Sequence, residues 1–260
     1  MHKISLLFLI AVFPMLAFSQ IDTTKKSKFI LASVSFEMGP MLDRYSNVDL
    51  DMMYNLTSNP YDIERNLVGH EATYDRDVEG SKLGASISLI PLNKKENDYS
   101  TVGEIRLGFF YKVRGTHLSY FLSNSSGAYK AVDYSTRFKE FSLHGAYVWK
   151  YNPKFAQRFT LHAGLGLGLG STFADKTSVA EIISSGLPSE IPNSFFEEYK
   201  GNSSLFVRAF TPIGVDFALS DRFDVGIQSN FGIAIQQVYG GENYIIPISG
   251  SVAVKLSYFF

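Results

Sequence analysis

The stretch Phe159-Thr160-Leu161-His162-Ala163-Gly164-Leu165-Gly166-Leu167-Gly168-Leu169 alternates strictly between two kinds of side chain. Its odd-numbered positions are all apolar, whereas its even-numbered positions are Thr, His and Gly. Successive side chains of a β-strand point to opposite faces, so the stretch predicts a strand with one apolar face and one small, polar face. The glycines alternate within the strand and no helix follows them, which argues against a nucleotide-binding loop.

Seven further stretches repeat this two-residue period, as expected for the wall of a barrel. They are 30–38, 82–89, 104–113, 140–150, 205–217, 224–236 and 248–260. Their polar face is rich in Gly and Ser with isolated charges, whereas a soluble β-sandwich, the main alternative, normally carries denser charge on its surface. A sheet that faces lipid must satisfy its backbone groups internally and therefore close. We predict an all-β fold, an eight-stranded antiparallel transmembrane β-barrel with long extracellular loops.

The N-terminus has the layout of a secretory signal. Met1-His2-Lys3 is a short positive start, residues 4–18 are almost wholly apolar, and Ala17-Phe18-Ser19 offers small residues for cleavage. The alternative, a membrane anchor, would need about 20 apolar residues. We expect residues 1–19 to be a cleaved signal peptide and residues 20–260 to form one outer-membrane β-barrel domain.

The composition excludes several classes of function. The chain has no cysteine, which excludes a disulfide scaffold, a thiolate metal site and a lipid-modified N-terminal cysteine. Its formal net charge of −1 gives no electrostatic case for nucleic acid. No motif predicts a cofactor.

The connections between the stretches alternate in length. Short links are expected at 91–100, 151–154 and 220–222, smaller ones at 123–128 and 238–246, and long loops at 43–80 and 171–203. An even number of strands places both termini and the short turns in the periplasm and the long loops outside the cell. Within the second long loop, residues 179–183 are expected to form a short helix.

Two segments resemble a known family. The last stretch alternates through Val254, Leu256 and Tyr258 to a terminal Phe260, and resembles the C-terminal assembly signal of outer-membrane barrels. Leu219-Ser220-Asp221-Arg222-Phe223 is similar to a periplasmic turn of the porin-like outer-membrane β-barrel domain family. This resemblance implies an eight-stranded barrel that the barrel assembly machinery inserts among outer-membrane lipid. It implies no single activity, since members include adhesins, small structural barrels and PorT-type secretion accessories.

The polar face carries charges of both signs. We expect an ionic network in the lumen, formed by Glu104, Arg106, Arg158, Arg208 and Asp216. An eight-stranded barrel leaves an interior just wide enough for side chains, so a filling network is favoured over an ion path. Two histidines, His144 and His162, also belong to this face, where hydrogen bonding is favoured over metal binding.

One pair of residues is suggestive of catalysis. The spacing of His117 and Ser119 is similar to that of PagL-type lipid A deacylases, and residues two apart in a strand share a face. Glu140 is the residue expected to orient the histidine. That family carries the motif late in the chain within a longer signature, so a polar pair at the rim is favoured over a catalytic site.

The long loops are acidic and aromatic. Asp75-Arg76-Asp77-Val78-Glu79 has alternating carboxylates but lacks the ligand number and turn glycine of a calcium loop, so a solvated face is favoured. The aromatic side chains expected to be exposed are Tyr54, Tyr61, Tyr74, Phe195, Phe196 and Tyr199. We therefore expect a non-enzymatic barrel whose extracellular loops bind a protein or glycan partner, or support an outer-membrane assembly. The alternatives are an outer-membrane lipid hydrolase using His117 and Ser119, and a narrow solute pore.

Overall fold

The computed structural model describes residues 29–75, 77–91, 102–123, 127–153, 155–185 and 192–260. The expected signal peptide and most of the link at 91–100 lie outside these ranges. Among the described residues, no helix is long and apolar enough to cross a membrane.

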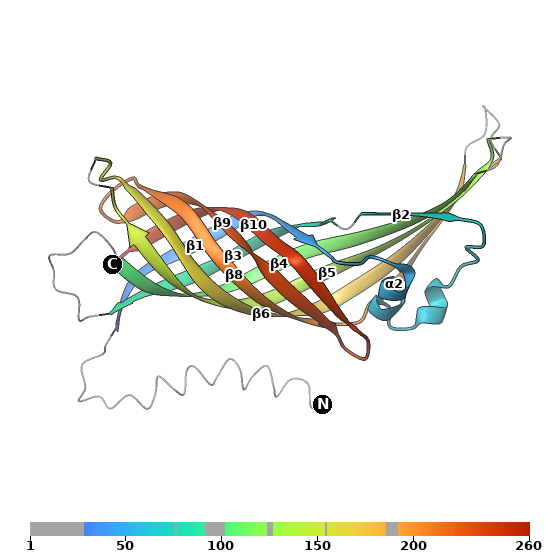
Figure 1. Ribbon diagram of the computed structural model, residues 1–260, viewed down its shortest axis with the longest axis horizontal. Coiled ribbons are helices and arrows are strands. Elements are labelled where there is room, and N and C mark those ends of the chain that lie inside the picture. The colour runs from blue at the N-terminus through green and yellow to red at the C-terminus, as the bar shows by residue number, and fades with distance from the viewer. Residues whose placement is uncertain (1–28, 76, 92–101, 124–126, 154, 186–191) are drawn as a thin grey trace.

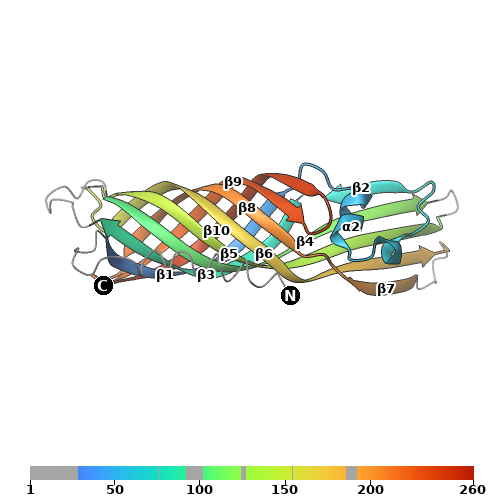
Figure 2. The same cartoon turned by 90° about the horizontal axis from the view of Figure 1, so that it is seen from below.

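Eight antiparallel strands form a closed ring (Figures 1 and 2). In chain order they are β1 (Phe29–Arg44), β3 (Asp77–Pro91), β4 (Val102–Ser123), β5 (Tyr129–Tyr151), β6 (Phe159–Ser184), β8 (Ser204–Ala218), β9 (Phe223–Val238) and β10 (Asn243–Phe259). Each pairs with its neighbours in the chain order, and β1 closes the ring against β10, with Phe36 opposite Leu256. The eight stretches that alternate in the sequence are these eight strands.

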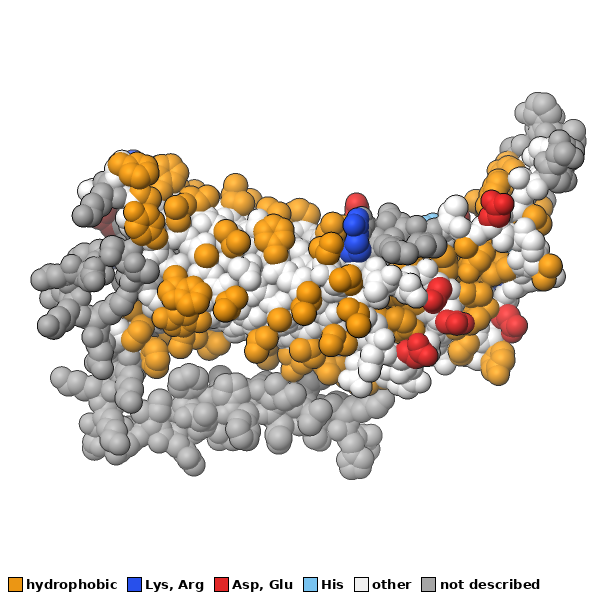
Figure 3. All heavy atoms as spheres, viewed as in Figure 1, with side chains coloured by type: hydrophobic (Ala, Val, Ile, Leu, Met, Phe, Trp, Pro, Cys, Tyr) orange, Lys and Arg blue, Asp and Glu red, His pale blue; other side chains and the backbone are white. Residues whose placement is uncertain are grey.

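The alternation separates an outer apolar face from a polar interior. On β1, Ser33, Ser35 and Glu37 are buried, whereas Phe36 and Met38 are 62% and 63% exposed. Figure 3 shows hydrophobic side chains over the barrel wall on the face in view, with charged ones gathered toward one end. An exposed apolar wall on a closed sheet is the arrangement that spans a membrane.

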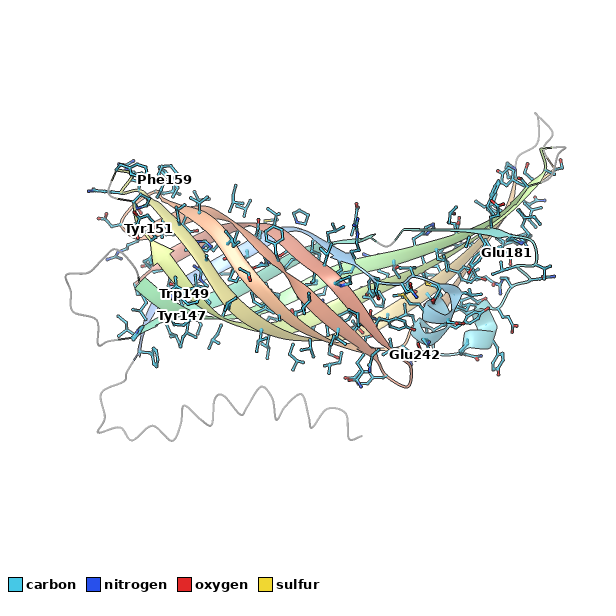
Figure 4. All side chains as sticks on the ribbon, in the orientation of Figure 1. Tyr147, Trp149, Tyr151, Phe159, Glu181 and Glu242 are labelled. Atoms are coloured by element: carbon cyan, nitrogen blue, oxygen red, sulfur yellow. The ribbon has the colours of Figure 1, made fainter. Side chains whose placement is uncertain are left out.

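Aromatic side chains mark both edges of this wall. At the end that holds the C-terminus, called here the terminal rim, the rings of Tyr147 and Trp149 lie 5.1 Å apart (Figure 4). At the opposite end, the far rim, the ring of Phe141 lies 4.8 Å from that of Phe173 and 5.3 Å from that of Phe109. The stretch 141–149, which runs from one group to the other, has the length of a transmembrane β-strand, about 9–11 residues. Such aromatic belts are typical of membrane–water interfaces.

Three strands continue well beyond the far rim (Figure 1). β4, β5 and β6 stay paired to their ends, and two short strands extend their sheet: β2 (Glu71–Asp75) on β4 and β7 (Asn193–Lys200) on β6. The long loop expected at 171–203 is therefore largely sheet. The short helix expected at 179–183 is wrong, because these residues pair with β5 on one side and β7 on the other and Val179 is buried in a core.

The first long loop is also folded. It contains the helix α2 (Leu50–Leu56) and the 3-10 turn η1 (Pro60–Ile63). Both lie beside the extended sheet at the far rim (Figure 2).

Candidate interaction platform at the far rim

The lumen near the terminal rim holds two groups of ion pairs. Glu104 accepts a hydrogen bond from Arg106 Nε and lies 2.8 Å from Lys150 Nζ, and Arg106 Nη1 donates to Gln228 Oε1 at 2.6 Å. Asp216 Oδ2 lies 2.8 Å from Lys255 Nζ. The structure thus places Glu104, Arg106 and Asp216 in the interior, each with a partner of opposite charge.

A third group surrounds Glu140 nearer the far rim. Its carboxylate lies 2.7 Å from Arg208 Nη1 and 3.1 Å from both Lys112 Nζ and Arg114 Nη2. Arg114 also pairs with Asp43. Because Glu140 is buried among these cations, the expectation that it orients His117 is wrong. In the sequence, alternation places Glu140 and Lys112 on the polar face of their strands. It does not show that Asp43, on another strand, lies near them.

Arg158 does not belong to the interior. It precedes β6 in the turn at the terminal rim and is exposed, and its carbonyl accepts a hydrogen bond from Ala218 N. The expectation that it joins the lumen network is wrong, because β6 begins at Phe159 and the alternation does not reach back to Arg158.

Aromatic rings occupy the middle of the lumen. The ring of His144 lies 4.6 Å from that of Phe110 and 5.0 Å from that of Phe210. The facing glycines make this possible: a Cβ on Gly166 would lie 2.5 Å from the ring of Phe210. The cavity beside these rings has a volume of about 20 Å³, enough for roughly one water molecule. Among the described residues, no group of three His, Asp or Glu side chains is placed to hold a metal ion.

Above the ion pairs, α2 closes the far end of the lumen. Asp49 caps the helix, since its carboxylate accepts a hydrogen bond from Met52 N at 2.8 Å. Met52, Met53 and Leu56 are fully buried in an apolar cluster with Phe206, whose ring faces the Arg114 guanidinium 3.8 Å away. The lumen therefore ends in an apolar plug over a layer of paired charges.

The extended sheet and its attached helix form what we call the platform. It consists of β2, β7, α2, η1 and the parts of β4, β5 and β6 at 115–123, 129–138 and 174–184. The inner face of the sheet buries Leu118, Val132, Tyr134 and Val179 against α2 and η1. A hydrophobic core therefore continues out of the barrel and makes the platform an ordered unit.

Arg65 fastens the first loop to the sheet. Its guanidinium pairs with Glu181 of β6 and lies 2.7 Å from Glu197 Oε2 of β7. Lys130 Nζ adds a fourth charge, 3.2 Å from Glu181 Oε2. Burial pushes the pKa of Glu181 upward, but the hydrogen bonds and charges of Lys130 and Arg65 outweigh it and hold that pKa below its ordinary value. Figure 4 shows Glu181 on the part of the platform that lies away from the barrel.

The outer parts of the platform expose large apolar side chains. Phe195 and Phe196 of β7 are 61% and 66% exposed, and Tyr61 of η1 is 82% exposed. Tyr54 and Tyr199, which were expected to be exposed, are instead half-buried and pack against the core. The side chain of Tyr74 lies outside the described part of the chain. The exposed aromatic surface is therefore smaller than expected and lies mainly on β7 and η1.

His117 and Ser119 do meet on the outer face of β4. His117 Nε2 lies 2.7 Å from Ser119 Oγ, and Ser119 Oγ donates to Asp133 Oδ1. In a catalytic triad the acid holds the other ring nitrogen of the histidine, so that the histidine is free to take the serine proton. Here Asp133 lies on the serine and 3.9 Å from the same Nε2, which suits a polar cluster on the surface better than an activated nucleophile.

Two of the loop carboxylates that the structure describes, those of Asp49 and Asp62, have structural partners. Asp49 caps α2, and Asp62 Oδ1 accepts a hydrogen bond from Asn59 Nδ2 at 2.7 Å. Arg76 lies outside the described residues, and so do the side chains of Asp75, Asp77 and Val78.

Comparisons with known proteins find similarity among solved structures of bacterial outer-membrane β-barrels. No protein-family model matches the chain, and no curated protein matches it. Neisserial surface protein A is 13% identical over 90% of this chain and 98% of its own, with a TM-score of 0.35. OprG from Pseudomonas aeruginosa is 9% identical over 88% and 96%, with a TM-score of 0.35. Ail of Yersinia pestis, crystallised with the heparin analogue sucrose octasulfate, is 13% identical over 89% and 100%, with a TM-score of 0.27.

Because these TM-scores are low, the fold is assigned from the structure of this chain and not from the comparisons. The closed ring, the apolar wall and the two aromatic belts are features of this structure. By its own strand pairing the chain is an eight-stranded antiparallel transmembrane β-barrel.

Proposed function

We propose that this protein is a non-enzymatic outer-membrane barrel of a Gram-negative bacterium that presents its platform to a protein or glycan partner outside the cell. One observation carries the proposal: β4, β5 and β6 continue beyond the far rim as a folded sheet with its own core. A barrel that only spans the membrane needs turns of a few residues at this end. A rigid sheet that holds exposed aromatic side chains suits binding better than passive shielding.

The membrane placement follows from the terminal strand and the topology. The chain ends on an alternating strand with an aromatic last residue, as outer-membrane barrels do, and an even number of strands puts both ends on one side. With the termini in the periplasm, the platform lies outside the cell. The sequence of residues 1–19 supports export to this compartment.

The binding test replaces exposed aromatic side chains and leaves the core intact. A Phe195→Ser, Phe196→Ser double variant should fold as a heat-modifiable barrel and lose a crosslinked partner that the parent recovers from whole cells. The matched control is Phe155→Ser, which removes a 92% exposed aromatic side chain at the terminal rim. If the double variant and the control recover the partner equally, these side chains are not the binding surface.

The two other candidate functions have less support. A solute pore is opposed by the aromatic filling of the lumen and by the plug at α2. A lipid hydrolase has a His–Ser contact at 2.7 Å, but the carboxylate lies on the serine. Should His117→Ala and Ser119→Ala each abolish the cellular function while the platform variant retains it, the hydrolase replaces our proposal.

A further inference from the structure

Four basic residues gather on the outer face of the platform where it leaves the barrel. Arg137 of β5 lies opposite Lys176 of β6, which in turn lies opposite Lys200 of β7. All three are exposed, and Lys176 is 58% exposed. Lys139 is the next outward-facing residue of β5 toward the barrel, and it lies opposite Phe173. We call Arg137, Lys176 and Lys200 the basic row.

A β-bulge puts Lys176 into this row. Up to Phe173 the odd-numbered residues of β6 face outward, so uninterrupted alternation would turn Lys176 inward. Ala174 has a left-handed backbone, with φ of 50°, and the register shifts between Arg137 and Lys139. After the shift Asp175 is buried and Lys176 is exposed. A left-handed backbone is unfavourable for a residue other than glycine, so a compensating interaction is expected.

Buried hydrogen bonds hold the bulge in place. The Asp175 carboxylate accepts hydrogen bonds from Thr172 Oγ1 and, at 3.4 Å, from Lys139 N. The Asp175 carbonyl accepts one from Gly201 N at 2.7 Å, which ties the bulge to the segment that follows β7. The bulge and its hydrogen bond to Gly201 thus fix the positions of both Lys176 and Lys200.

The basic row is short of negative charge. Side chains directly opposite each other in neighbouring strands lie about 4.5–5.5 Å apart, and like charges in such pairs are destabilising. Within the described outer face, Glu198 gives one carboxylate to Lys176, at 2.5 Å, and Glu79 of β3 lines the same surface pocket as Arg137. Two carboxylates beside the four cations of the row and Lys139 leave room for a bound anion that would relieve the repulsion.

The location identifies the kind of anion. Lys139, just below the row, sits opposite Phe173, whose ring stacks on Phe141 in the aromatic belt at the far rim. Aromatic belts lie at headgroup level, so the row faces the headgroups of the surrounding lipid. On the basis of this placement, we propose that Arg137, Lys176 and Lys200, with Lys139, bind a phosphate group on the headgroup of an anionic lipid in the outer leaflet. This inference rests on the membrane orientation given under the proposed function.

Lipid retention by the purified full-length protein tests the proposal. The parent and an Arg137→Gln, Lys176→Gln double variant are exchanged into nanodiscs of phosphatidylcholine with or without purified lipopolysaccharide. Bound lipopolysaccharide is then counted by native mass spectrometry after transfer to neutral detergent. We expect the double variant to bind roughly 30-fold more weakly, about fivefold for each charge removed. An Arg158→Gln, Arg222→Gln variant removes the same charge at the terminal rim and should bind like the parent.

Two further arms make the result specific. A charge-preserving Arg137→Lys, Lys176→Arg variant should bind within a few-fold of the parent, and the double Gln variant should remain heat-modifiable, since both side chains are exposed. Inorganic phosphate at constant ionic strength should not displace the lipid. Equal lipid binding by the parent and the double Gln variant would overturn the proposal, and so would displacement by inorganic phosphate, which would point to a soluble anion. Because the readout is lipid and not a crosslinked partner, the outcome is independent of the Phe195 and Phe196 test.

Discussion

Leu165 and Thr160 belong to the same strand but face different surroundings. Leu165 is 62% exposed on the apolar wall, whereas Thr160 is half-buried near the terminal rim and accepts a hydrogen bond from Asn152 Nδ2 at 2.8 Å. An arginine on the lipid face near mid-depth costs about 2–4 kcal/mol, and the cost falls toward the interfaces. We therefore expect Leu165→Arg to lower the free energy of unfolding in lipid vesicles by about that amount, and Thr160→Arg to lower it much less. Equal losses in the two variants would mean that the facing of β6 is wrong.

Glu181 makes the attachment of the first loop dependent on pH. Its pKa in the folded protein is below the ordinary carboxyl value, so its stabilising effect is complete above that ordinary value and is lost as the pH falls through the lower folded pKa. We expect the hydrogen-exchange protection factors of residues 60–66, which compare the measured rates with the intrinsic rates at the same pH, to be high near neutral pH and to fall at about pH 3, below the ordinary carboxyl pKa of about 4.3.

Two variants separate this ion pair from general acid effects. Glu181→Gln should give low protection factors in residues 60–66 at both pH values, because it cannot form the charged contact with Arg65 and Lys130. Glu242→Gln, an exposed acid in the β9–β10 connection at the far rim, should behave like the parent (Figure 4). If the parent keeps its protection factors at low pH, the pair does not hold the loop.

At the residue scale, alternation predicted the facing of side chains well but not their partners. It placed Glu104 and Arg208 on the inner face, because a period of two applies wherever a strand is regular. It extended that period to Arg158, which precedes the strand and is exposed. It did not connect Glu140 with Asp43 and Arg114, because their proximity depends on the stagger of strands around the ring.

The last strand carries a prediction at the scale of the element. β10 closes the ring against β1, and Phe260 follows it with 72% of its surface exposed beside Tyr258, at a ring separation of 5.3 Å. We expect removal of Phe260, or Phe260→Asp, to lower the amount of protein assembled in the membrane, because the proposed assembly signal would lose its aromatic end. Membrane-fraction immunoblots measure this amount. Normal assembly of the truncated chain would remove the argument from the terminus.

The sequence predicts the existence of the eight strands better than their length. β4, β5 and β6 continue beyond the aromatic belt, where their outer face becomes polar and their inner face becomes apolar. Because of this reversal, a search for strands with an apolar outer face does not detect these extensions. The bulge at Ala174 then shifts the alternation by one residue, so that 179–183 no longer continues the pattern of 159–169. The inner face is covered by α2, which comes from a distant part of the chain.

At the scale of the whole molecule, the filled interior predicts how the barrel behaves in a bilayer. Paired charges occupy both ends of the lumen, rings occupy its middle, and α2 covers the far mouth. Eight strands leave little space beyond what side chains fill. We expect the purified protein to give no sustained large conductance in planar bilayers. Stable openings of porin size would contradict the plug and favour the pore.

The central claim, that the platform lies outside the cell and the termini lie inside, can be tested with single cysteines. The chain has no cysteine of its own, so each introduced thiol is the sole target of a maleimide. Tyr61→Cys on the platform and Phe155→Cys at the terminal rim replace side chains that are 82% and 92% exposed. On intact cells, a membrane-impermeant maleimide should label Tyr61→Cys and should label Phe155→Cys only after lysis. Labelling of Phe155→Cys on intact cells, with Tyr61→Cys protected, would reverse the orientation and contradict the account.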